Sequence, residues 1–264
     1  MSDHSAYLRR YWFGAEAKED MADTVLLMER DRVDQYQAAL DRTECRFSAV
    51  FRGITGRFQG KRVSVVYSIG PAHVADCVAF LSLGFGIKRL FATGSIGGLS
   101  AEMGDIVLAD GCATQDGYSL SVFRDEVVEC PVGRVVRLQP SPAPTISERQ
   151  RDRLREEFDC GIRAVPIFTV PAVSVEDRES LTAIRELGYA ALDLETGPFL
   201  SACRKHDIPG TCIHWVTDLP LERDFYFPYH GDPELIRRDH TRKYRQWLNM
   251  PRVILPILGE LWTT

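Results

Sequence analysis

The sequence lacks the features of a membrane or secreted protein. No apolar run approaches the ~20 residues that a membrane-spanning helix needs, and the first residues, "MSDHSAYLRRYWFG", carry charge where a signal peptide would be apolar. The seven cysteines are odd in number and form no CxxC pair, which argues against a disulfide framework and a zinc site. We therefore expect buried thiols in a cytoplasmic protein that binds no membrane and no metal.

An excess of positive charge is also missing. The net charge is −5, so nothing attracts the protein generally to nucleic acid. The one basic stretch, "RRDHTRKYR" at 237–245, lies between apolar residues at helical spacing, which favours a solvated helix face. Neither the dinucleotide pattern GxGxxG nor the phosphate loop GxxxxGK[ST] occurs. We expect no nucleic-acid partner and no organic cofactor.

What is present is the composition of an ordinary globular domain. Apolar residues make up 45% and charged residues 26% of 264 residues, enough for a full core. In the first half, the apolar run 23–28 predicts a strand and 31–40 a helix, and 61–70 predicts a strand before a helix that begins at Pro71. Residues 88–95 and 104–113 are two further strands, separated by the glycine turn of "ATGSIGG".

The second half repeats this alternation. Asp177 is suited to cap a helix over 178–187, which Gly188 ends, and a strand over 189–194, a helix over 195–206 and a strand over 210–217 follow. A last helix is expected from Asp232 and Pro233 to about Asn249, with a short apolar tail after Pro251. We predict one α/β domain over 1–264, with a mixed, largely parallel twisted sheet covered by helices on both faces. Residues 1–20 are an N-terminal extension.

Polar residues gather where the predicted strands end, which is where open parallel sheets bind ligands. These strand ends are Met28 to Arg32, Ser68 to Gly70, Thr93 to Gly98, Phe168, Asp193 to Thr196, and Thr217 with Asp218. Each also has a structural interpretation. The glycines allow positive φ and a tight turn, Glu195 and Asp218 are suited to cap a helix and a turn, and Phe168 is suited to the core.

Taken in order, three segments resemble the nucleoside phosphorylase and nucleosidase superfamily. They are "GRFQGKRVSVVYSIGPAHV", "IKRLFATGSIGGLSAEMGDIVLAD" and "YAALDLETGPFLSACRKHDIPGTCIHWVTD", within a similarity that runs from "MADTVLL" to "WVTD". The resemblance implies cleavage of the N-glycosidic bond of a nucleoside, by a homo-oligomer without a cofactor.

The resemblance also implies roles for single residues. Glu195 matches a glutamate that accepts hydrogen bonds from the ribose hydroxyls, beside Leu194, where the family usually has methionine, and Asp193, where another glutamate is common. Asp218, after Thr217, matches an aspartate that protonates or hydrogen-bonds the departing purine, and Phe168 matches an aromatic residue that stacks on the base. The pocket for an anion or nucleophile is expected at Gly70, Thr93, Gly94, Ser95 and Arg32.

Two missing arginines favour hydrolysis over phosphorolysis. Phosphorolytic members bind phosphate through arginines at three places, of which this chain keeps Arg32 but has Ala49 and Ala92 at the other two. An alanine methyl group cannot replace the bidentate guanidinium. A phosphate-dependent phosphorylase stays an alternative, because Arg30, Arg46, Arg52 or a neighbouring subunit could supply the charge. A non-catalytic nucleoside-binding module is a second alternative.

Two further departures from the family concern aromatic residues. Phe13 falls where some members have a histidine that reaches the ribose 5′-hydroxyl of a neighbour, so it suits an apolar 5′ group or is a packing residue. The divergent segment 219–232 contains Phe225, Tyr226, Phe227 and Tyr229, which could cover the base or pack at a subunit interface. Purine is the favoured base because the chain lacks the QxR pyrimidine clamp of uridine-specific relatives.

Overall fold

The computed structural model describes residues 3–17, 21–29, 32–68, 71–141, 143, 145–222 and 233–261. The strands are β1 (Thr24–Met28), β2 (Arg42–Ser48), β3 (Arg52–Phe58), β4 (Lys61–Tyr67), β5 (Arg89–Thr93), β6 (Ser95–Gly98), β7 (Ile106–Thr114), β8 (Val128–Cys130), β9 (Gly133–Leu138), β10 (Ile162–Thr169), β11 (Ala191–Asp193) and β12 (Gly210–Asp218). The helices are α1 (Asp3–Trp12), α2 (Val33–Ala39), α3 (Pro71–Phe85), α4 (Gly117–Val122), α5 (Glu148–Phe158), α6 (Arg178–Glu186), α7 (Thr196–Lys205) and α8 (Pro233–Leu261), with 3-10 turns at Ala15–Ala17, Arg124–Glu126 and Val173–Val175.

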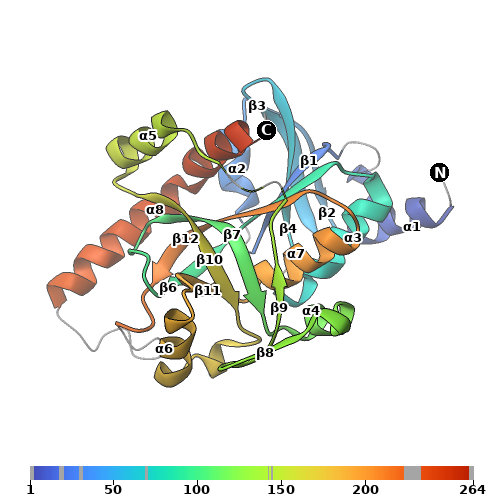
Figure 1. The fold of residues 1–264 in the computed structure, drawn as a ribbon. Coiled ribbons are helices and arrows are strands. Elements are labelled where there is room, and N and C mark those ends of the chain that lie inside the picture. The colour runs from blue at the N-terminus through green and yellow to red at the C-terminus, as the bar shows by residue number, and fades with distance from the viewer. Residues whose placement is uncertain are drawn as a thin grey trace.

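One mixed sheet runs through the molecule. Its strand order is β2-β3-β4-β1-β5-β12-β6-β11-β10-β7-β9-β8 (Figure 1), and an additional pairing of β12 with β7 closes five of these strands into a ring. Six of the twelve pairings are parallel, and the other six are antiparallel. The predicted mixed α/β sheet is confirmed, although parallel pairing is less dominant than expected because the β2–β3–β4 and β8–β9 hairpins extend both edges.

Helices cover both faces of the sheet, as predicted. Helices α3 and α7 pack on one face, in the core cluster that contains Leu81 and Phe199. On the other face, α2, α5 and α8 bury residues that include Tyr36, Leu154 and Ile254. All seven cysteines are free thiols. In the described part of the chain, no helix is both long enough and apolar enough to cross a membrane.

The C-terminal helix is longer than the sequence predicts. Helix α8 does not end near Asn249 but continues through Pro251 and Pro256 to Leu261. A proline inside a helix costs about 3 kcal/mol, whereas a fully buried aliphatic side chain contributes about 1.5–3 kcal/mol. The buried side chains of this last part outweigh the two prolines; they are Met250, Val253, Ile254, Leu255, Ile257, Leu258 and Leu261.

The glycine-rich segment is a strand and not the predicted turn. Residues Ser95–Gly98 form β6, and none of Gly94, Gly97 and Gly98 has a positive φ. The glycines are needed for close approach instead. A Cβ on Gly98 would lie 2.7 Å from the carbonyl oxygen of Ala101 and 2.9 Å from the side chain of Leu219. Neighbouring segments therefore pack against bare backbone.

The helix ends follow ordinary capping chemistry. Asp177 caps α6 as predicted, since its carboxylate accepts a hydrogen bond of 2.8 Å from the backbone N–H of Ser180. After α6, Gly188 has φ +93°, which a residue with a Cβ rarely adopts.

The N-terminal extension packs against the body of the protein through aromatic rings. Trp12 at the end of α1 stacks on Phe80 of α3, with ring centroids 4.4 Å apart. Phe13 has no exposed surface and contacts Phe51 and Phe85 at 5.3 and 5.1 Å. This position agrees with the packing interpretation of Phe13 and not with a contact to a 5′ group.

We predict that Phe13→Ala destabilises the protein by about 3–5 kcal/mol, because it leaves a cavity among packed aromatic rings. The free energy of unfolding in urea measures this loss. Tyr11→Ala, two residues earlier at the end of α1 and with 55% exposure, is the control and should change it by less than about 1 kcal/mol. Equal effects of the two substitutions would contradict the packing role.

Candidate functional site

Strand β6 lies between the two strands whose ends carry the predicted acidic residues. Gly97 pairs with Leu192 of β11 on one side and with Asp218 of β12 on the other. Because β11 is antiparallel to β6 and β12 is parallel to it, the chain beyond Leu192 runs towards Ser95. The predicted strand ends are therefore neither adjacent nor parallel, and β6 separates them.

Asp218 lies directly against the glycine strand. A Cβ on Gly97 would lie 3.4 Å from Asp218 Oδ2, so the missing side chain makes room for this carboxyl group. The hydroxyl of Thr217, which is itself buried, donates a hydrogen bond of 2.8 Å to the other oxygen, Oδ1. Asp218 is half-buried at the end of β12.

Glu195 is buried, with 9% of its surface exposed. It is the N-cap residue of α7, but its side chain makes no capping hydrogen bond. The cap is Asp193, whose Oδ2 accepts a 2.9 Å hydrogen bond from the backbone N–H of Thr196. The Glu195 carboxylate instead accepts a 3.2 Å hydrogen bond from the backbone N–H of Leu194. The capping interpretation of Glu195 is therefore wrong, and Asp193 has that role.

Glu29 is a site residue that the sequence analysis did not single out. It follows β1, and the hydroxyl of Ser95 donates a hydrogen bond to its Oε1. A Cβ on Gly94 would lie 2.8 Å from the carboxyl carbon of Glu29, so Gly94 has room only for its hydrogen. In the sequence, Glu29 lies within the predicted strand end Met28 to Arg32, and this position is the feature that could have indicated it.

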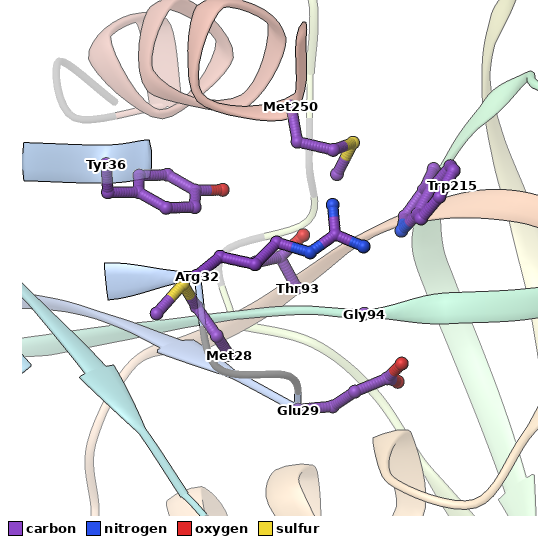
Figure 2. A pocket seen from close by; sticks show the side chains of 8 residues that line it. All are labelled: Met28, Glu29, Arg32, Tyr36, Thr93, Gly94, Trp215 and Met250. Atoms are coloured by element: carbon purple, nitrogen blue, oxygen red, sulfur yellow. The ribbon is translucent and has the colours of Figure 1, made fainter. Parts of the chain in front are cut away.

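A small pocket lies beside Gly94, and its lining includes Glu29 together with Arg32, Tyr36, Thr93, Trp215 and Met250. Its wall includes Arg32, whose guanidinium carbon lies 5.1 Å from the ring centre of Trp215, a cation–π distance. In Figure 2 the Arg32 guanidinium lies near Trp215 and Met250, and the Glu29 carboxylate lies near Gly94. One positive and one negative side chain therefore line the same pocket.

This pocket contains hydrogen-bonding groups that the described residues do not satisfy. The hydroxyls of Tyr36 and Thr93 are buried and have no hydrogen-bond partner among the described residues. Burial raises the pKa of Tyr36 far above its ordinary value, against a smaller opposite effect of Arg32, so the phenol keeps its proton and remains a donor. We name the pocket formed by Arg32, Tyr36, Thr93, Trp215 and Met250, which Glu29 also lines, the arginine pocket.

Glu176 is a further acidic residue near Asp218 that sequence reasoning missed. It lies in the connection from β10 to α6, which begins with a 2.9 Å hydrogen bond from the N–H of Val170 to the carbonyl of Asp193. Burial, followed by the negative charges of Asp218 and Asp193, raises the pKa of Glu176 to about 7. Glu176 therefore exchanges its proton near neutral pH.

Other predicted residues lie differently. Phe168 has no exposed surface and contacts Tyr189 edge to face at 5.2 Å, which agrees with the core interpretation and leaves no face for a base. Leu194 is half-buried and packs against the hydrophobic cluster that contains Phe168. Gly70, Arg30 and the aromatic residues Phe225, Tyr226, Phe227 and Tyr229 lie outside the described residues.

The possible substitute arginines are engaged on the surface. Arg46 and Arg52 form ion pairs with Asp34 at 2.8 and 3.4 Å. Ala92 is buried in β5, and Ala49 is exposed between β2 and β3. Among the described side chains, no group of three His, Cys, Asp or Glu residues could hold a metal ion.

Solved structures of other proteins share this fold. Uridine phosphorylase from Vibrio fischeri has a TM-score of 0.72 at 15% identity, covering 92% of this chain and 93% of its own. The Campylobacter jejuni 5′-methylthioadenosine/S-adenosyl homocysteine nucleosidase gives 0.64 at 16%, covering 91% and 99%. The Helicobacter pylori MTAN gives 0.63 at 15%, covering 90% and 99%. At such identities these structures establish the fold alone.

Among curated proteins, none matches the sequence significantly. The family model described as "Phosphorylase superfamily" matches residues 25–237, which is most of the chain and contains β6, Glu29, Glu195 and Asp218. Members of this superfamily act on nucleosides, with or without phosphate. The chain belongs to the phosphorylase superfamily.

Proposed function

We propose that the protein hydrolyses the N-glycosidic bond of a nucleoside, with a purine as the favoured base. The observation that carries this proposal is the carboxylate of Glu29, which covers Gly94 and accepts a hydrogen bond from Ser95. A second anion would meet its negative charge at the glycine segment, whereas a water molecule could give it a proton. The alanines at positions 49 and 92 support the same conclusion.

Cleavage of this bond develops positive charge on the ribose and negative charge on the base. A carboxylate beside the sugar and a proton donor beside the base therefore both stabilise the transition state. In our proposal, Glu195 accepts hydrogen bonds from the ribose hydroxyls and Asp218 protonates the departing base. Glu29 takes the proton of the attacking water, which is held by Ser95.

In this proposal, Glu176 acts together with Asp218, which gives a proton to the departing base. Two carboxyl groups that repel each other keep one proton between them to a higher pH than either would alone. The raised pKa of Glu176, about 7, supports such sharing with Asp218. The pair then still holds a proton for the leaving base close to neutral pH.

Phosphorolysis remains a second candidate because of the arginine pocket. Arg32 carries the charge that phosphate needs, and the hydroxyls of Tyr36 and Thr93 are buried donors without partners among the described residues. Glu29 also lines this pocket, so a phosphate bound there would lie near a negative charge as well as near Arg32. The proposed cytoplasmic location and homo-oligomeric state follow from the family resemblance and stay proposals.

The deciding experiment incubates the protein with purine and pyrimidine nucleosides, including 5′-deoxy-5′-methylthio analogues, with and without inorganic phosphate. We expect release of a purine base without phosphate, together with a free reducing sugar, both measured by chromatography. Release that requires phosphate and yields a ribose 1-phosphate would overturn hydrolysis. Tight nucleoside binding without any release would indicate a non-catalytic module.

We predict that Glu29→Gln lowers kcat of base release by about 100-fold or more, because glutamine can still accept from Ser95 but cannot take a proton from water. The affinity for a non-hydrolysable substrate analogue should change little. Glu179→Gln, at an exposed residue of α6, removes the same charge and is the control. Unchanged kcat in Glu29→Gln would remove this residue from the mechanism.

We predict that kcat/KM falls as pH rises through about 7, when the Glu176–Asp218 pair loses its last proton. Glu176→Gln removes one negative charge, so the remaining carboxyl group loses its proton more easily and the fall moves to lower pH. The charges of Asp193 and Glu195 are the same in both proteins. A pH profile that Glu176→Gln leaves unchanged would contradict this coupling.

Asp218→Asn should lower turnover by about 100-fold or more.

A further inference from the structure

The turn that carries Glu195 is held by the carboxylate of Asp193. Its Oδ1 accepts a hydrogen bond of 2.7 Å from the hydroxyl of Thr169 in β10. Its Oδ2 accepts from the N–H of Thr196 at 2.9 Å and from the hydroxyl of Thr196 at 2.5 Å. The N–H of Gly197 donates in turn to the Thr169 hydroxyl at 2.9 Å. Both oxygens of Asp193 are therefore engaged within the protein.

His214 of β12 also belongs to this hydrogen-bond network. It is 1% exposed, and its Nε2 lies 2.9 Å from the Thr196 hydroxyl and 3.7 Å from Asp193 Oδ2. The single proton of the Thr196 hydroxyl goes to Asp193, so His214 must donate from Nε2. The other ring nitrogen, Nδ1, has no hydrogen-bond partner among the described residues. The histidine is therefore held in this network through Nε2.

We propose that Asp193, Thr196 and His214 form a brace that positions Glu195, so that Asp193 is a positioning residue and Glu195 alone binds the ribose diol. The three residues come from β11, α7 and β12, and Thr169 of β10 donates a hydrogen bond to Asp193. Asp193 and Thr196 lie before and after Glu195 in the chain. A side chain whose neighbours are fixed on both sides keeps its carboxylate in place without losing further entropy when the sugar binds. This inference rests on the proposed function.

The brace is tested with Thr196→Val, which keeps the shape of the side chain and removes the hydroxyl that joins Asp193 to His214. The readout is the ratio of kcat/KM for a purine ribonucleoside to kcat/KM for its 2′,3′-dideoxy analogue, which lacks the hydroxyls that Glu195 would bind. A displaced Glu195 loses only the ribose-dependent part of catalysis. We expect the ratio to fall about tenfold.

Ser201→Ala is the matched control, because it removes another buried hydroxyl of α7, which donates at 2.6 Å to Ser119 and lies one turn beyond the brace. It should leave the ratio unchanged. His214→Gln can place an amide N–H near the Nε2 position and should keep most of the ratio, whereas His214→Phe should lower it. Thermal melting of each variant shows whether it is folded.

The outcomes separate the two proposals. If the wild-type protein releases no base from any nucleoside, the proposed function fails. If the wild type is active and Thr196→Val keeps the wild-type ratio, or lowers it no more than Ser201→Ala, the brace is overturned. An Asp193→Asn protein with an unchanged KM for the ribonucleoside and a lowered kcat supports a positioning role, and a raised KM with unchanged kcat shows that Asp193 binds the sugar directly.

Discussion

The site depends on the absence of side chains along one short strand. Strand β6 lies between β11 and β12, and a Cβ at Gly94, Gly97 or Gly98 would meet Glu29, Asp218 and the Ala101 backbone respectively. No larger residue fits at Gly94 or Gly98 without moving these neighbours. The bare backbone thus makes room for the Glu29 carboxyl group at Gly94 and for the Asp218 carboxyl group at Gly97.

One negative and one positive side chain line the pocket beside Gly94. Glu29 accepts a hydrogen bond from Ser95, and Arg32 lies over Trp215. The superfamily contains two chemistries that need opposite charges. Attack by water needs a base that takes a proton, and attack by phosphate needs cationic donors that bind an anion.

Holding acidic groups in place requires internal partners. Asp193 makes three hydrogen bonds inside the protein, which explains how an acidic residue beside Glu195 can be buried. Glu176, by contrast, lies where burial and like charges act in the same direction and favour its protonated form.

The sequence by itself determined the alternation of strands and helices, the cap at Asp177 and the strand ends at which Glu195 and Asp218 lie, because apolar periodicity and capping residues act locally. Only the tertiary structure decided the rest. The glycine segment pairs as a strand, α8 continues through two prolines, Phe168 is buried, and Glu29 and Glu176 join the site. Each of these depends on contacts between residues far apart in the chain, and local patterns do not encode which distant surface will be adjacent.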